Sequence, residues 1–194
     1  MNNRSVDIAI QDAQAEFAQL EELIRSEGIS NKIRYFTFYS LIKACGVIEY
    51  SYKTIVADFH DGCSPQLQTY IDKKVRNNSN NPSLDNIRNL LISFDPAWNN
   101  SFNNALSSHP YKDRLKSSLS SLNTNRNSFA HGQSCTATFS DIKKYFNDAI
   151  EIIKMVDDAV YNMAYSKQKC IAARTAGDRW GSTPRFATKL SITD

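Results

Sequence analysis

The sequence predicts an all-α protein: a helical bundle with a long aromatic second helix, extra short helices and an irregular basic C-terminal tail. Glycine and proline are scarce, with six and five residues among 194, and long β-branched runs are absent. Up to residue 165, apolar residues recur three and four positions apart, which is the spacing of amphipathic helices. This periodicity stops there. We therefore predict a helical domain over residues 1–165 and an irregular tail over residues 166–194.

Composition and charge limit the classes of function. Hydrophobic residues make up 41% and charged residues 22%, which is ordinary for a globular domain, and the net charge of +3 permits nucleic acid as a partner without requiring it. No apolar run approaches the ~18 residues of a membrane span, and the N-terminus has no apolar signal core. We expect a cytoplasmic protein with reduced thiols. The cysteines and histidines lack zinc-site spacing, so we expect no metal and no cofactor.

The first two expected helices cover residues 6–26 and 31–59. The first has an acidic outer face, which makes it a poor surface for RNA; its expected inner residues are Ile8, Ala15, Leu20, Leu23 and Ile24. The second is apolar on more than one face, as suits the centre of a bundle or a subunit contact. Glu49 lies in its middle. This carboxylate either faces solvent or a salt-bridge partner, or it orients Arg126 from behind.

Three further segments precede the motif described below. Ser64 and Pro65 are good start signals for a helix over residues 65–76. Its basic end, Lys73, Lys74 and Arg76, serves either solubility and the helix dipole or contact with RNA. A polar loop follows, and then a short helix over residues 84–92 capped by Ser83.

The asparagine-rich residues 95–108 contain poor helix formers and predict one short, irregular helix. Trp98 and Phe102 are four positions apart there. They either pack in the core or stack on an unpaired base.

The segment over residues 111–132 carries the residues of greatest chemical interest. Leu115, Leu119 and Leu122 recur at helical spacing, and Gly132 is a natural helix stop because glycine adopts left-handed backbone at little cost. Arg126 follows the last leucine by one turn. His131 is expected at the exposed C-terminal end of this helix. An arginine binds phosphate oxygens with a planar fork and a histidine titrates near neutral pH, which together suit RNA cleavage without a metal.

Arg126, Asn127 and His131, with four residues between the arginine and the histidine, resemble the motif of the HEPN superfamily. The resemblance covers about residues 5–165 and includes the second helix with its glutamate. It implies a helical, metal-independent endoribonuclease that works as a homodimer with the active site at the interface. Superfamily members commonly act as toxins or anti-phage defence effectors, so an antitoxin or other regulatory protein is a possible partner.

The expected mechanism is attack by the ribose 2′-hydroxyl, with His131 transferring the proton and Arg126 neutralising the phosphate charge. Asn127 either bonds the phosphate or fixes the helix end. The alternative is a non-catalytic module that binds RNA, a nucleotide or a partner protein. In that case His131 only caps its helix and Arg126 pairs with a carboxylate such as Glu49.

In a straight helix, Arg126 and His131 point in different directions, so helix geometry alone does not form a catalytic site. Residues five apart diverge by about 140° around a straight helix, so Arg126 and His131 do not converge unless the helix end unwinds or the side chains curve round. Two copies meeting about a two-fold axis solve the problem by lining one shared cleft.

The remaining expected elements are a long helix over residues 139–165, capped by Ser140 and Asp141, and the tail. The tail combines basic residues with Trp180 and Phe186. It either contacts RNA or a partner, or straps back over the bundle.

Overall fold

A computed structural model of the chain describes residues 1–27, 31–133 and 135–177, with side chains for residues 1–26, 31–133 and 135–162. Every regular element in these ranges is helical, which confirms the all-α class, and no strand occurs among them. The chain divides into two compact units, Met1–Met163 and Ala164–Asp194. In order, the elements are α1 (Arg4–Glu27), α2 (Lys32–Asp58), α3 (Pro65–Ile71), the π-helical turn η1 (Asp72–Arg76), α4 (Leu84–Phe94), α5 (Pro96–Ser108), α6 (Lys112–Ala130) and α7 (Phe139–Gly177).

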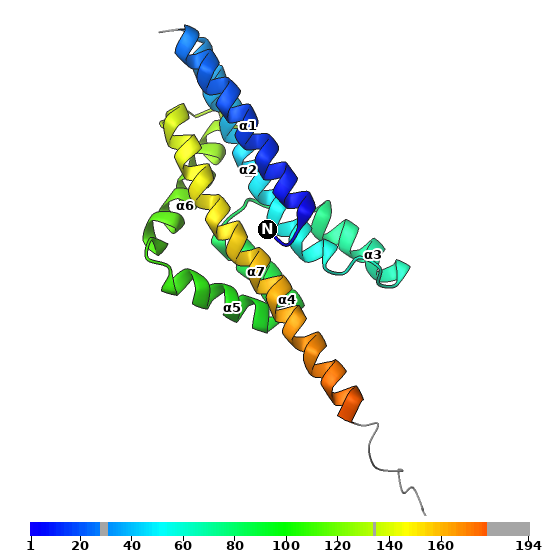
Figure 1. The fold of residues 1–194 in the computed structure, drawn as a ribbon. Helices are drawn as coiled ribbons and strands as arrows, with labels where there is room; N and C mark the ends of the chain where they lie inside the picture. Colours follow the sequence, from blue (N-terminus) through cyan, green and yellow to red (C-terminus); the bar gives the residue numbers. More distant parts are fainter. Residues whose placement is uncertain (28–30, 134, 178–194) are drawn as a thin grey trace, which may run out of the picture. The chain divides into compact units, whose positions relative to one another are not determined.

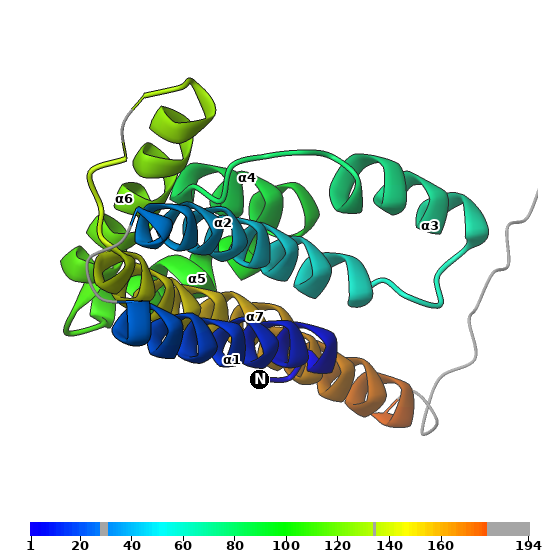
Figure 2. The same ribbon diagram turned by 90° about the horizontal axis from the view of Figure 1, so that it is seen from above.

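Helix α2 is the central element of the first unit. It contacts α1, α4, α6 and η1 (Figure 1). Seen from above, α1 and α7 lie on one side of α2 and α4 lies on the other (Figure 2). The apolar residues on more than one face of α2 therefore pack against several neighbours, which confirms the prediction of a central position.

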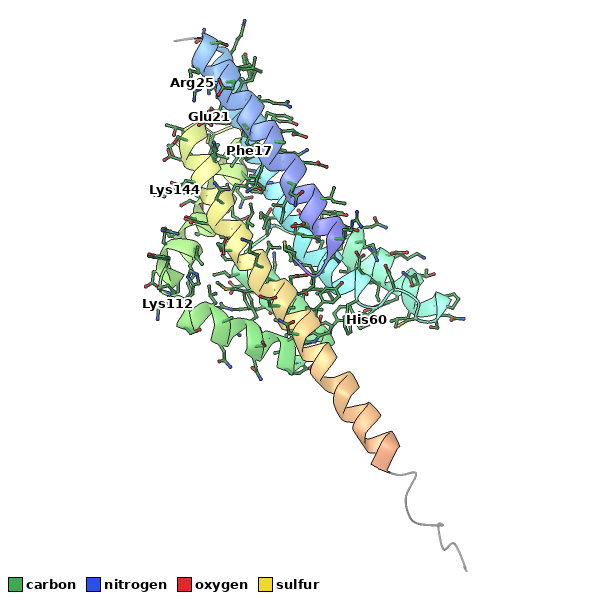
Figure 3. All side chains as sticks on the ribbon, viewed as in Figure 1. Phe17, Glu21, Arg25, His60, Lys112 and Lys144 are labelled. Atoms are coloured by element: carbon green, nitrogen blue, oxygen red, sulfur yellow. The ribbon has the colours of Figure 1, made fainter. Side chains whose placement is uncertain are left out.

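The buried face of α1 differs from the expected one. Val6, Ile10, Ala13 and Phe17 are buried, and the Phe17 ring contacts Phe146 and Phe139 of α7, with centroids 5.2 and 6.2 Å apart (Figure 3). The expected inner residues Ile8 and Leu23 are 48% and 47% exposed, and Ala15 is exposed as well, so that part of the prediction was wrong. Ile8 is two positions from both Val6 and Ile10, about 200° around the helix, and therefore faces solvent.

Capping residues were predicted for three helices, and two of these caps form as expected. Ser64 accepts a hydrogen bond from the Leu67 N–H at 3.4 Å, and Ser83 accepts one from the Asn86 N–H at 3.1 Å, as expected of caps. Helix α7 is capped by Thr138 rather than Ser140. The Thr138 hydroxyl accepts from the Asp141 N–H at 3.2 Å, and the Asp141 carboxylate accepts from the Thr138 N–H at 2.9 Å. This reciprocal pair is a capping box.

Helix α5 corrects the expectation of a short, irregular helix. It runs for 13 residues, with the Asp95 side chain accepting from the Ala97 N–H at 2.9 Å. Trp98, Phe102 and Leu106 form its buried face. Packing of this stripe outweighs the poor helix propensity of the asparagines between them. Trp98 and Phe102 are therefore core residues rather than stacking platforms.

The last helix is longer than predicted. We expected it to end near residue 165, but the α7 backbone continues to Gly177, so residues 166–177 are not irregular. Trp180, Phe186 and the rest of residues 178–194 lie outside the described residues. Of the helices described, none is long and apolar enough to span a membrane.

Candidate functional site

The end of α6 is shaped by Gly132, as the sequence predicts. His131 ends the helix with φ −93° and ψ 15°, and Gly132 turns to φ +72°. The Gly132 N–H donates to the Phe129 carbonyl at 3.0 Å and the Gln133 N–H to the Ser128 carbonyl at 2.8 Å, the two bonds of a Schellman motif. His131 is thus the first residue beyond the regular helix. It is exposed, and no described side chain bonds its imidazole.

Arg126 is half-buried one turn before the helix end. Its Nη1 donates to the Asn127 side-chain oxygen at 3.3 Å, and no carboxylate among the described residues forms an ion pair with it. The guanidinium is close enough to Cys45 of α2 for its charge to act on that thiol, although burial dominates and raises the pKa of Cys45 to about 12. Arg126 is therefore held near the core without being neutralised, which leaves its charge available to an anion.

Glu49 has partners other than Arg126. Its carboxylate accepts from the Lys53 ammonium, one turn along α2, and from the Asn80 backbone N–H at 2.8 Å. No direct hydrogen bond joins it to Arg126 in the described structure. Glu49 thus links the loop over residues 77–83 to α2. The sequence did not indicate this contact with the loop.

The same loop is held on its other side by α6. Asn81 donates from Nδ2 to the Asn127 Oδ1 at 3.1 Å, and Asn123 donates from Nδ2 to the Pro82 carbonyl at 2.9 Å. Because Asn127 Oδ1 accepts from both Asn81 and Arg126, its orientation is defined, and its Nδ2 donors are left for another acceptor. The four-residue spacing of Asn123 and Asn127 was the available signal for this clamp, since it places both on one helix face.

A second cation and two aromatic rings lie beside the motif. The Phe129 ring contacts Phe38 of α2 with centroids 4.5 Å apart, and the Arg34 guanidinium lies 5.2 Å from the Phe38 centroid. The end of α6 lies at the same end of the bundle as the starts of α2 and α7 (Figures 1 and 2). Arg34 was not among the predicted site residues, because only the tertiary contact between Phe38 and Phe129 brings it near.

Asn125 fixes the segment that follows the motif. Its side-chain oxygen accepts from the backbone N–H groups of Thr136 and Ala137, each at 3.3 Å. Its Nδ2 donates back to the Ser121 carbonyl at 2.9 Å. The chain after His131 is therefore anchored to α6 itself.

A groove runs along α6 from Asn127. It has a volume of about 300 Å³, is walled by α4 on its other side, and contains Lys116, Arg88 and Asp85. Arg88 is partly engaged, because it donates to Asn103 at 2.9 Å and lies 3.7 Å from Asp85. Lys116 has no ion-pair partner in the described ranges. The groove therefore extends from Lys116 to Asn127 of the motif.

The predicted basic cluster on η1 separates into two parts. Arg76 pairs with Asp58 at 2.6 Å, Asp61 at 2.8 Å and Asp72 at 3.0 Å, so its charge is balanced within the fold. Lys73 and Lys74 are exposed and form no ion pair with a described side chain. Arg76 thus joins η1 to the end of α2, and contact with RNA stays a prediction for the two lysines.

No group of three or more His, Cys, Asp or Glu side chains that could hold a metal ion occurs among the residues described. A family model described as RiboL-PSP-HEPN matches residues 8–162, a range that contains every site residue discussed above. Neither curated proteins nor solved structures include a significant match to the chain.

Proposed function

Because the chain belongs to the RiboL-PSP-HEPN family, we propose that it is a metal-independent endoribonuclease built around Arg126, Asn127 and His131. The observation that carries this proposal is the presence at one helix end of two groups, an exposed imidazole and a guanidinium that no carboxylate neutralises in the described structure. A purely structural arginine, such as Arg76, has its carboxylates beside it. Arg126 lacks them, at a position where phosphate would supply the missing anion.

The reaction uses a nucleophile that RNA carries itself. The ribose 2′-oxygen attacks the adjacent phosphorus while the bond from phosphorus to the 5′-oxygen breaks. The 2′-hydroxyl loses one proton and the leaving oxygen gains one, so His131 is needed only to accept and deliver protons. Arg126 stabilises the negative charge that builds on the phosphate oxygens. The products are a 2′,3′-cyclic phosphate and a 5′-hydroxyl.

Asn127 acts through its free amide nitrogen. Asn81 and Arg126 occupy its oxygen, so Nδ2 donates to a phosphate oxygen of the bound strand. The loop over residues 77–83 thereby positions a group that touches the substrate.

A second copy of the chain completes the site in this proposal. An exposed apolar stripe on α2, formed by Tyr35, Tyr39, Ile42 and Tyr50, begins beside Arg34 at the motif end of the bundle. A shallow groove of about 510 Å³ around Ile42, Gly46 and Tyr50 continues it against α1. Exposed apolar surface of this kind is typical of protein interfaces. A homodimer formed there brings two motifs together, so that Arg126 of one chain and His131 of the other line one cleft.

Cleavage of a synthetic RNA tests the activity. Arg126→Ala and His131→Ala are each expected to lower the cleavage rate by about 10²–10³-fold, while His109→Ala, a change at the histidine that ends α5, leaves it unchanged. A substrate with 2′-deoxyribose at the scissile position is not cut, and EDTA has no effect. Cleavage that survives His131→Ala contradicts the mechanism. RNA binding without any cleavage indicates the non-catalytic module instead.

A toxin or defence effector restrained by a regulatory protein is the cellular role that fits such a nuclease. Expression of the wild-type chain alone should arrest growth, and expression of His131→Ala at the same level should not. Equal growth with both chains argues against this role while leaving the chemistry open to the cleavage assay.

A further inference from the structure

A separate cavity lies on the far side of the loop over residues 77–83 from the motif. It has a volume of about 210 Å³ between α2, η1 and α4. This volume is well above the ~10–15 Å³ that a single water molecule requires, so the space can hold several water molecules or one planar heterocycle. Asn78, Asn80 and Asn89 line it with side-chain amides that bond no described partner.

Tyr52 is the most buried residue of the cavity wall. It is 2% exposed, yet its hydroxyl has no hydrogen-bond partner among the residues that the structure describes. Buried polar groups in folded proteins are nearly always bonded, so an unsatisfied hydroxyl beside a cavity points to a ligand. Burial raises the pKa of Tyr52 well above its ordinary value, and the nearby Glu49 carboxylate raises it further. The group therefore stays protonated and offers a donor to an acceptor inside the cavity.

The charge of the cavity favours an anion. No carboxylate belongs to its wall, and it has two lysines. The Lys53 ammonium is already bound by Glu49 and by the Asn78 carbonyl. Lys74, by contrast, is exposed and forms no ion pair with a described side chain. One positive charge is thus left at the opening.

We propose that this cavity binds one nucleotide unit of the RNA, with the base inside against the amides and Tyr52 and a phosphate at Lys74. An amide side chain carries both a donor and an acceptor, which is what the edge of an unpaired base requires. Leu90 and Val75 supply apolar contact for the ring. The choice of RNA as the source of this nucleotide rests on the proposed function; the recognition chemistry rests on the cavity.

The loop connects the cavity to the motif. Asn80 lines the cavity, and its neighbour Asn81 bonds Asn127 on α6. A base held against Asn80 therefore steadies the residue that positions Asn127. Through this connection the cavity selects which stretch of a strand is presented to Arg126 and His131.

Binding of a short single-stranded RNA with 2′-O-methyl groups throughout tests this inference on the full chain. Such a strand lacks the nucleophile and is not cut, so fluorescence anisotropy reports binding alone. Tyr52→Phe removes only the hydroxyl and is expected to weaken binding by about 2–10-fold. Asn89→Ala and Lys74→Ala are expected to weaken it similarly. The matched controls Asn104→Ala on α5 and Lys112→Ala at the start of α6, which alter exposed side chains outside the cavity wall, leave it unchanged.

Competition by the four nucleoside monophosphates identifies the source of the base. At least one of them is expected to displace the strand and to bind Tyr52→Phe more weakly than the wild type. The inference is overturned if the cavity variants bind the strand like their controls, since an ordered water then satisfies Tyr52. It is also overturned if a monophosphate binds the cavity without displacing the strand, because the site then serves a free nucleotide. Loss of cleavage with binding at the cavity retained refutes the nuclease but not the cavity.

Discussion

At the scale of single residues, the neighbours of Asn127 determine which of its amide atoms can contact a substrate. Its oxygen is occupied by Asn81 and Arg126, so only its nitrogen faces a substrate. Asn127→Asp keeps the size but replaces that donor with a carboxylate oxygen, which pairs with Arg126 and repels phosphate. We expect the cleavage rate to fall by about 10²-fold. Single-turnover kinetics measure it, and a rate within twofold of the wild type removes Asn127 from the site.

Cys45 gives a second prediction at this scale. Burial raises its thiol pKa to about 12, although the nearby Arg126 charge opposes the rise. The thiol is therefore protonated and enclosed at pH 8, whereas Cys63 is exposed. With a thiol-reactive maleimide, we expect Cys63 to be modified in the native protein and Cys45 only after unfolding, as peptide mass spectrometry would show. Rapid native labelling of Cys45 would mean that α2 and α6 separate there.

At the scale of elements, the start of α7 depends on a pH-sensitive cap. Hydrogen bonds from the Thr138 hydroxyl and N–H lower the pKa of Asp141 below its ordinary value of 3.8. The stabilisation is therefore complete above that value and is lost as pH falls through the folded-state pKa. We expect Thr138→Ala and Asp141→Ala each to cost about 1 kcal/mol of unfolding free energy at pH 7. Ser140→Ala should cost nothing measurable.

Urea unfolding at pH 7 and at pH 3 checks this cap. The cost of Asp141→Ala should shrink at the lower pH, because pH 3 lies below the ordinary carboxyl pKa of 3.8 and protonation then favours the unfolded chain. A cost that is equal at both pH values, or a larger cost for Ser140→Ala, contradicts the assignment of the cap to Thr138 and Asp141.

The elements also show which structural features could be predicted from the sequence and which could not. Ser64, Ser83 and Gly132 act through bonds to residues within four positions, so local chemistry was enough to predict them. Other roles depend on distant parts of the chain. Glu49 bonds Asn80, which is 31 positions away, and Asn81 bonds Asn127, which is 46 positions away. Arg34 lies near the motif only because Phe38 contacts Phe129. The length of helix α5 was underestimated for a related reason. The burial of Trp98 and Phe102 stabilises this helix, although the helix propensity of its asparagines is poor.

At the scale of the whole molecule, we propose that each site takes Arg126 and His131 from two different chains, because the two residues lie five positions apart at one helix end. Mixing two inactive variants tests this directly. If each site takes its arginine from one subunit and its histidine from the other, a heterodimer of Arg126→Ala with His131→Ala contains one intact site. An equal mixture that exchanges subunits then recovers up to about a quarter of wild-type cleavage, because half the dimers are mixed and each has one of two sites.

Light scattering provides the control for this mixture by showing that each variant alone is a dimer of the 22.0 kDa chain. Ile42→Asp, placed in the apolar stripe of α2, is expected to give monomers that neither cleave RNA nor complement either variant, with helix content unchanged by circular dichroism. If the two variants exchange subunits freely and no activity returns, both groups of each site come from one chain. An active monomer would remove the second copy from the mechanism altogether.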